Sequence, residues 1–462
     1  MTSTTAPTGV TRPWPTALVL ATAMFLVLFD SLAVATALPH IGEGLGLGPG
    51  SLQWVVSLFS LSIGGLLVLG GRLCDLWGRR RMLLTSIALS TAACLLAGLA
   101  QGLPLLLTGR TLQGVGAAFA IPAALASAAT LFPEEPWHSR VFSIVAASAN
   151  SAGLAGAVVG GLLTAELGWR WVFLAPVPVG AVALVATYLL VPPDPPRASG
   201  SARLDLPGAL LATGGLVALI YGVGQFAETS SPRALVPVAI GVALLGVLVV
   251  VERRVADPLV KPRVVRSRRL VGSCIAFGAH SAAYAAVVVI GSVYLQDVHG
   301  LSAAGAGLVL APVLLAAMIS AVPAGALTRR FGSRVVVAVS LALCAGTLAV
   351  VAFNTDSSLA VIMPWLIAWG LSAGPVYVGL TRECIGDAAP EDRGTASALF
   401  ESTTHVGGAV SIAAYLPLLG AGFGYAGVEF IGVVVVAAGA IATFLILPGP
   451  GAPRRQEPVP GR

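Results

Sequence analysis

Apolar residues along this chain form long runs, separated from one another by short polar or glycine-rich segments. A transmembrane helix needs about 20 apolar residues to cross roughly 30 Å of hydrocarbon, so each run is long enough to span a membrane. The pattern therefore predicts an all-α, polytopic membrane protein with fourteen transmembrane helices. The predicted spans are residues 15–38, 51–71, 82–101, 104–131, 139–164, 171–191, 207–226, 234–252, 270–296, 302–327, 334–354, 357–380, 393–418 and 425–448.

The composition excludes a soluble domain, because 56% of the 462 residues are hydrophobic and only 10% are charged. The residues before the first run hold one arginine, and no small-residue cleavage site follows that run. We therefore expect a short solvated tail and a first span that is retained.

Basic residues test the span count, because Lys and Arg collect in the cytoplasmic loops of membrane proteins. With the N-terminus inside, 23 of the 26 basic residues lie at the termini or in inner loops; Arg170 and Arg233 fall outside, and Arg110 is embedded. This predicts a multi-pass protein of the cell (inner or plasma) membrane with both termini cytoplasmic. The net charge of +6 then reflects topology and anionic lipid, and no nucleic acid is expected as a partner.

The cysteines and the single lysine argue against metal, cofactor and nucleotide chemistry. The five cysteines have no CxxC spacing, so we expect packing residues and no metal site, and the sequence indicates no cofactor. Lys261 precedes a proline, which excludes a GxxxxGK phosphate loop. Energy for transport must then come from a gradient or from another chain.

An internal repeat divides the chain into two halves. GRLCDLWGRRR from Gly71 aligns with GALTRRFGSRV from Gly325 at a constant offset of 254 residues, and the charged stretch 252–270 joins spans 8 and 9 on the predicted inner face. Duplicated halves are typical of transporters. The predicted units are a tail at 1–14, a six-helix bundle at 15–191, a linker with an inserted hairpin of spans 7 and 8 at 192–269, a second six-helix bundle at 270–448 and a tail at 449–462.

Four stretches resemble motifs of the fourteen-span drug:proton antiporter branch of the major facilitator superfamily. They are GGRLCDLWGRRRM (70–82, the loop between spans 2 and 3), GRTLQGVGAA (109–118, span 4), FDSLAVATALP (29–39, span 1) and GTASALFESTTHVGGA (394–409, span 13). The residues between Asp30 and Leu38 differ from the usual sequence of the span 1 motif. The resemblance implies a secondary active transporter, not an enzyme, with two pseudo-symmetric six-helix bundles plus an inserted two-helix hairpin.

The span 5 motif of this branch usually reads Gly-Pro-x-x-Gly-Gly, and here it reads GAVVGG, residues 156–161. Gly156, Gly160 and Gly161 preserve close helix packing, whereas Ala157 removes the proline and its kink. The departure leaves import open as an alternative direction.

The loop at 70–82 is expected to act as a conformational latch between helix bundles. Gly71 and Gly78 permit tight turns, and Asp75 can pair with Arg79, Arg80 or Arg81 at a helix end. The alternative is an ordinary cytoplasmic anchor of positive charge.

Asp30 and Arg110 lie at matching depths in the outer half of the membrane, counted at 1.5 Å per residue. Intramembrane charges are costly and face a partner or a water-filled cavity, so we expect the two to influence each other and to couple protons. A static structural ion pair is the alternative.

Glu401 and His405 share one face of span 13 at i, i+4 spacing, and both can titrate during a proton-driven cycle. Glu401 is a second candidate for proton coupling, and His405 is a candidate for the substrate cavity or a neutral core residue. His280 in span 9 is a weaker candidate of the same kind. Glu429 lies near the outer interface, so we expect it to be solvated.

Trp365 and Trp369 in span 12 are also i, i+4 and lie deep in the membrane, among prolines and glycines that make this helix irregular. Indole faces suit flat or cationic organic substrates, so we assign them to a substrate cavity with Tyr377 and Gln113. Interior packing is the alternative.

These patterns favour a proton-coupled exporter of small hydrophobic or cationic organic molecules that works by alternating access. A proton-coupled importer or symporter is the alternative within transport. A non-transporting membrane receptor or enzyme would need a sensory domain or a nucleophile–base constellation, and the sequence signals neither. The expected partners are a small-molecule substrate, protons and membrane lipid, and we expect a monomer.

Overall fold

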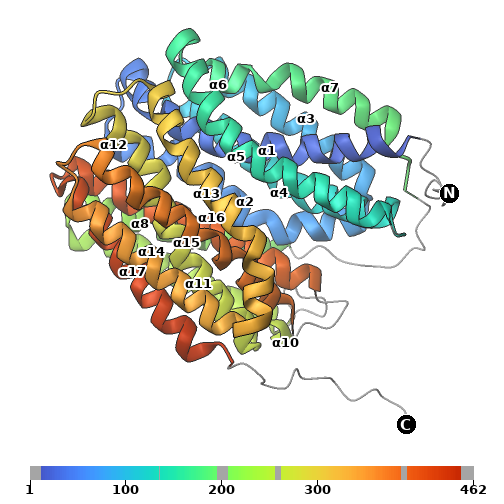
Figure 1. Cartoon of the computed structure of the whole chain (residues 1–462). Coiled ribbons are helices and arrows are strands. Elements are labelled where there is room, and N and C mark those ends of the chain that lie inside the picture. The colour runs from blue at the N-terminus through green and yellow to red at the C-terminus, as the bar shows by residue number, and fades with distance from the viewer. Residues whose placement is uncertain (1–11, 135, 195–205, 255–261, 387–392, 449–462) are drawn as a thin grey trace.

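The computed structural model describes residues 12–134, 136–194, 206–254, 262–386 and 393–448, and these ranges are helical with no β-strand (Figure 1). Fourteen long helical segments follow one another, and each overlaps one predicted span. They are α1 (Pro13–Leu45), α2 (Pro49–Trp77), α3 (Arg79–Gly98), α4 (Leu103–Leu131), α5 (Trp137–Leu167), α6 with α7 (Trp171–Leu174, Pro176–Leu190), α8 (Leu206–Thr229), α9 (Leu235–Glu252), α11 with η2 and α12 (Arg268–Tyr284, Ala285–Ile290, Gly291–Asp297), α13 (Ala303–Phe331), α14 (Ser333–Phe353), α15 (Leu359–Gly386), α16 (Arg393–Gly420) and α17 (Gly424–Ile446). The prediction of an all-α, polytopic membrane protein is confirmed.

Thirteen of the described segments are long and apolar enough to cross a membrane. The fourteenth, α16, is as long as its neighbours but carries the polar run from Glu401 to His405. Its place in the series follows from its length and packing, because α16 lies between helices of both halves. A polar helix in that position marks a surface that lipid does not cover.

The two copies of the internal repeat fold alike. Gly78 separates α2 from α3 with φ 96° and ψ 145°, and Gly332 separates α13 from α14 with φ 82° and ψ 145°. Residues that carry a side chain rarely adopt a positive φ, so glycine is required for the sharp turn between the two helices. Residues 1–11 of the predicted N-terminal tail (1–14), the predicted C-terminal tail (449–462) and residues 195–205 and 255–261 of the predicted linker lie outside the described residues.

Helix packing repeats between the two halves. In the first, α1 packs on α5, α2 and α3 pack on α4, and α3 packs on α7. In the second, α11 packs on α16, α13 and α14 pack on α15, and α14 packs on α17. The same span-to-span contacts therefore recur after an offset of eight spans, which is the pattern of duplicated bundles.

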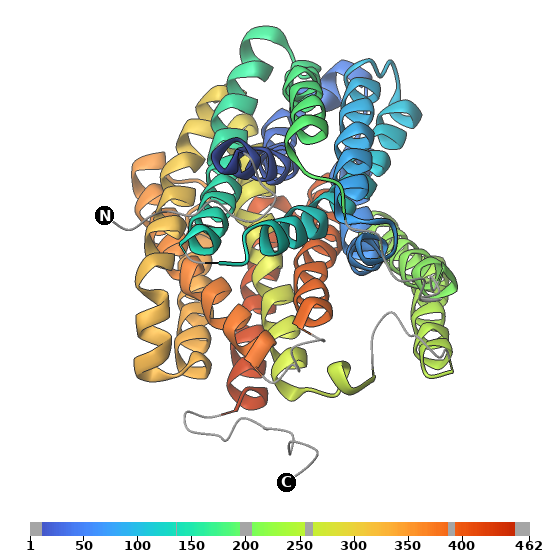
Figure 2. The ribbon, with the colours of Figure 1, turned by 90° about the vertical axis from the view of Figure 1, so that its right-hand side faces the viewer.

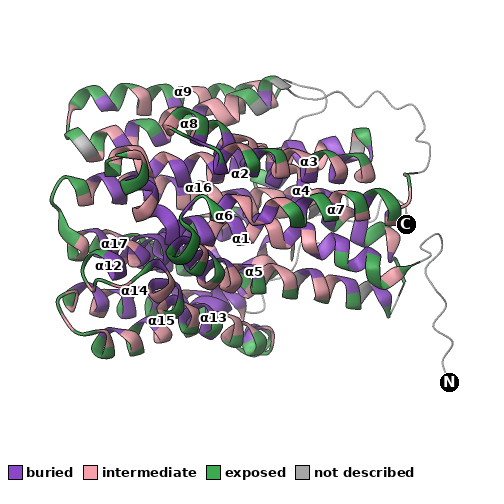
Figure 3. Cartoon of the chain, turned by 90° about the horizontal axis from the view of Figure 1, so that it is seen from above, coloured by how far each residue is buried: buried purple, intermediate pink, exposed green. Residues whose placement is uncertain are grey.

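The inserted hairpin lies beside this pair of bundles. α8 packs against α2 of the first half and α16 of the second, whereas α9 packs against α8 (Figure 3). The light-green pair stands at the right-hand margin in Figure 2. Of the residues of α9, only Gly241 is buried, so most of this helix is left to face lipid.

The halves meet closely at the ends predicted to face outward. A Cβ on Gly161 of α5 would collide with the backbone of Ala303 in α13, and Gln296 Nε2 donates a hydrogen bond to Thr36 O at 3.1 Å. Farther along α13, toward the predicted inner end, Val322 is 83% exposed. The molecule is therefore closed at its predicted outer end.

Candidate functional site

A buried ion pair joins α1 to α4 inside the first half. Arg110 Nη1 donates to Asp30 Oδ2, and Arg110 Nε donates to Val55 O at 2.7 Å. Gln113 Nε2 donates to Asp30 Oδ1 at 2.9 Å, so both carboxylate oxygens accept hydrogen bonds. Arg110 is fully buried and Asp30 is 4% exposed. The site brings together the two residues that the sequence placed at the same depth, and their part in coupling stays a prediction.

Aromatic rings complete the surroundings of Arg110. Its Cζ lies 4.3 Å from the centre of the Phe59 ring and 5.8 Å from that of Phe173. A guanidinium over an aromatic face gains electrostatic stabilisation where water is excluded. These two rings were not foreseen, because sequence spacing does not show which aromatic residue of another span faces a given charge.

A narrow cavity of about 30 Å³ adjoins the pair within the same half. Asp30, Gln113, Ser90, Thr91 and Cys94 contribute polar atoms to its wall, and Gln113 Nε2 also donates to Cys94 Sγ at 3.0 Å. Such a volume holds about two water molecules. Gln113 is thus bound into the ion-pair cluster, and its expected place in a substrate cavity stays a prediction.

The loop between α2 and α3 is held by a residue that the sequence did not single out. Asp194 Oδ2 accepts a hydrogen bond from Arg80 N at 3.0 Å, and Asp194 Oδ1 lies 3.5 Å from Arg79 Nε. A Cβ on Gly78 would lie 2.6 Å from Asp194 Oδ2, so glycine gives the carboxylate access to the start of α3. An acid at a helix N-terminus is favoured by the helix dipole.

The side chain of Asp75 lies outside the described residues, and so does its expected pairing with the arginines of the loop. Gly71 is loosely packed, with a Cβ reaching only Pro122 at 4.0 Å. A signal for Asp194 existed, since it is an acid in the inner loop that follows span 6, on the same face as the basic loop. Its partnership could not be chosen from sequence among several inner-loop acids.

The glycines of α5 face two different neighbours. A Cβ on Gly156 would lie 2.5 Å from Phe29 O, and one on Gly160 would lie 2.5 Å from Ala33 Cα, both in α1. Gly161 instead faces α13 of the other half. The motif therefore brings α5 close to a helix of each half.

In the second half, Tyr377 of α15 donates a hydrogen bond to Glu401 Oε1 of α16 at 2.8 Å. Tyr377 is 46% exposed and its hydrogen bond to Glu401 is exposed as well, so the two side chains form part of an accessible wall of the second half. His405 lies a turn farther along α16, at the contact with Gly64 of α2. The pair offers a carboxyl group and a phenol ring on this wall.

Four nearly parallel rings form a column behind this wall. Phe277 stacks on Phe400 at 4.4 Å and on His280 at 6.0 Å, and His280 stacks on Trp369 at 6.0 Å. All four are at least nine-tenths buried. The column therefore supports the wall from behind and offers no open ring face.

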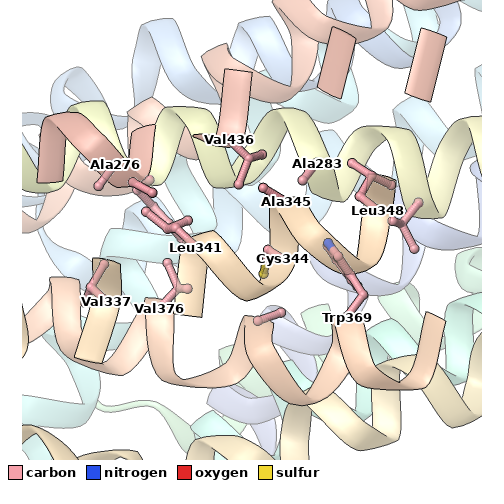
Figure 4. Close-up of a cluster of buried hydrophobic side chains, with 14 of the residues drawn as sticks. Ala276, Ala283, Val337, Leu341, Cys344, Ala345, Leu348, Trp369, Val376 and Val436 are labelled. Carbon is pink, nitrogen blue, oxygen red and sulfur yellow. The ribbon is translucent and has the colours of Figure 1, made fainter. Parts of the chain in front are cut away.

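Trp369 requires a correction, because it is 1% exposed and packs among the apolar core of the second half with Cys344 and Leu348 (Figure 4). Interior packing, which was the alternative to the substrate cavity, is therefore the role of Trp369. Trp365 is 42% exposed, so two tryptophans a turn apart have different surroundings. Their shared spacing was a weak guide, because α15 is packed on more than one side.

Glu429 also differs from expectation. It is 5% exposed, and its Oε2 atom is buried with no hydrogen-bond partner among the described residues. The expectation of a solvated carboxylate near the outer interface was wrong, because the residue faces the interior of the second half.

Paired helical bundles that enclose buried charges across fourteen membrane-length segments define a multi-pass transporter of small molecules. The chain belongs to the Major Facilitator Superfamily, whose family model matches residues 20–412. The fold of this superfamily supports secondary transport, in which a gradient supplies the energy.

Two curated relatives cover most of the chain. The cephamycin export protein of Amycolatopsis lactamdurans is 38% identical over 91% of this chain and 88% of its own length. The puromycin resistance protein of Streptomyces alboniger is 35% identical over 87% of this chain and 81% of its own length. Among solved structures, the nucleoside transporter NupG matches 94% of this chain and 100% of its own with a TM-score of 0.68 at 11% identity, which is a likeness of fold.

Proposed function

We propose that this protein exports small hydrophobic or cationic organic molecules in exchange for protons. The observation that carries the proposal is the buried cluster of Asp30, Arg110 and Gln113. A proton on Asp30 removes the charge that holds Arg110, so protonation changes the balance between two arrangements of the first half. The adjoining cavity gives a water molecule access to the carboxylate.

The relatives support the direction and the class of substrate. Their names specify export of cephamycin and resistance to puromycin, and resistance follows when a toxic molecule leaves the cell. Glu401 and Tyr377 supply a carboxyl group and a ring on an accessible wall, which favours cationic or aromatic solutes. Import with protons is the competing direction, since Ala157 replaces the proline of the export motif.

The organisation proposed with this function has both termini in the cytoplasm, two six-helix bundles and an inserted hairpin, in a monomer surrounded by lipid. Lys and Arg collect in the loops that this orientation puts inside. The loop of Gly71, Asp75 and Gly78 is the proposed latch, with Arg79 and Arg80 tied to Asp194 in this conformation.

Everted membrane vesicles with an acid interior test the proposal. The parent should accumulate ethidium and puromycin in the lumen when the gradient is imposed, and a protonophore should abolish accumulation. Asp30→Asn should lose the gradient-driven part, while Glu43→Gln, at an exposed acid of the same helix, should keep it. Accumulation that ignores the gradient overturns proton coupling, and proton-driven depletion of a preloaded lumen establishes import.

A further inference from the structure

The second half contains a buried acid that the exchange described above does not use. Glu429 lies five residues from the first residue of α17, and Tyr415 lies five residues from the last residue of α16. At 1.5 Å per residue, both lie about 7.5 Å below the predicted outer ends of their helices. The two side chains are therefore at the same depth.

The packing brings these side chains to the same place. A Cβ on Gly432, one turn along α17 from Glu429, would lie 3.4 Å from Tyr415 Oη and 3.5 Å from Ala286 Cβ. α16 and α17 also pack directly against each other. Tyr415 is 2% exposed with Ser411 of its own helix beside its hydroxyl, and Glu429 Oε2 is buried without a hydrogen-bond partner among the described residues.

The helix opposite has an irregular backbone at this point. Residues Ala285–Ile290 form η2, a π-helical turn in which all six residues are buried. Helices rarely include π-helical turns, and those that do often have them at functional sites. η2 packs on both α16 and α17, the helices that carry Tyr415 and Glu429.

No counter-charge accompanies this acid. Among the described residues, no Arg, Lys or His forms an ion pair with Glu429. The groups that face this region are Tyr415 of α16, Tyr294 of α12 and Tyr425 of α17, and the charged groups beyond them are the acids Asp297 and Asp356. His299 Nε2 is paired with Tyr294 Oη at 2.9 Å. A buried carboxylate without a cation is costly, so the neutral acid is the form that this conformation accommodates.

We propose that Glu429, with Tyr415 beside it, is a second proton-binding site, which takes its proton from the outer side and holds it while the outer end is closed. Tyr415 belongs to the apolar cluster that joins the halves at that end, together with Leu38 and Ile41 of α1. When the halves separate there, water from the outer side reaches the Glu429 carboxylate. A hydronium ion then transfers its proton to that carboxylate, leaving a neutral carboxyl group and water, and closure of the outer end encloses the neutral acid. This site rests on the proposed proton exchange for its role in transport, but its protonation does not.

Infrared spectroscopy of the purified protein in lipid tests the protonation directly, without transport. At neutral pH the parent should show the C=O stretching band of a buried protonated carboxyl group, and Glu429→Gln should remove that band. Tyr415→Phe should shift the band and keep its area, and Glu43→Gln should leave it unchanged. A Glu429→Gln spectrum identical to the parent spectrum overturns the site, and so does a parent spectrum with a carboxylate only.

Reconstituted vesicles then test the link to transport. The number of protons moved per ethidium, measured from the gradient that just stops net flux, should fall by about one in Glu429→Gln. If Glu429→Gln loses the infrared band but moves the same number of protons per ethidium as the parent, then Glu429 holds a proton that is not transported, and its part in coupling is overturned. Should Glu429→Gln fail to fold, the Tyr415→Phe variant tests the site instead. An unshifted infrared band in that variant would show that the protonated carboxyl group does not lie beside Tyr415, and it would overturn the proposed site.

Discussion

Asp30 and Glu429 are buried acids in opposite halves of one molecule, and their surroundings are opposite. Asp30 accepts hydrogen bonds on both oxygens and faces the Arg110 guanidinium, whereas Glu429 has an unpartnered oxygen and no cation beside it. The first setting stabilises a carboxylate and the second stabilises a neutral acid. Two carboxyl groups of similar burial can therefore hold different charges in a single conformation.

Removing the counter-charge gives the largest expected effect. Arg110→Leu leaves the Asp30 carboxylate buried without a cation, which should cost about 3–5 kcal/mol of stability. The double variant with Asp30→Asn should recover more than half of that loss, because it removes the orphaned charge. Thermal unfolding in detergent measures both. Equal losses of stability in the single and double variants would show that Arg110 stabilises the protein through its contacts with the Phe59 and Phe173 rings and not through Asp30.

Asp30→Asn alone should affect transport far more than stability. Asparagine keeps an acceptor for Gln113 but releases no proton, so gradient-driven flux should fall at least tenfold while binding of ethidium changes little. Flux in vesicles and direct binding to the purified variant separate the two quantities. Lost binding of cations with intact gradient-driven flux of puromycin would make Asp30 a counter-charge for substrate.

Gly161→Ala should distinguish the two acids by opening the outer end. The added methyl group collides with the backbone of Ala303, so the halves must separate there, whereas Gly346→Ala meets no neighbour and is the matched control. A cysteine at Thr36, in a background without native cysteines, should react several-fold faster with an impermeant maleimide in Gly161→Ala. The infrared band of Glu429 should shrink in the same variant. An unchanged reaction rate would contradict the closed outer end.

Tyr377→Phe should have the smallest effect. Glu401 is a third acid of the membrane-spanning helices, and unlike Asp30 and Glu429 it takes part in an exposed hydrogen bond, donated by Tyr377. Water can replace the lost donor, so the change should stay below about 1 kcal/mol, or about fivefold in affinity for ethidium. Binding to purified protein measures it, with Tyr221→Phe on α8 as the control. A tenfold loss of affinity would place the phenol hydroxyl in direct contact with the substrate.

Much of the fold could be read from the sequence because membrane crossing imposes length and composition on every helix. The glycine turns at Gly78 and Gly332 could be predicted from the internal repeat, because a repeated segment that keeps its glycines also keeps the backbone conformation that needs them. Depth counts also placed Asp30 and Arg110 at one level, because distance along a helix is fixed by its rise.

Counts along a helix do not give the direction of a side chain around it. Glu429 was judged by its depth and expected in solvent, but it points into the bundle. Trp369 shared its spacing with Trp365 and still packs in the core. Asp194 was missed because it lies 114 residues from Arg80, and only the assembled bundle brings them together.

The hairpin that joins the halves in sequence also breaks the symmetry between them. α8 lies along the seam where α2 meets α16, so protein borders that side of the molecule. On the other seam, between α5 and α13, neither helix of the inserted hairpin packs against the contact among the described residues. The duplicated bundles thus have one flank covered by an additional helix and one flank without such a helix, so we expect lipid to contact the seam between the halves on the α5–α13 side only.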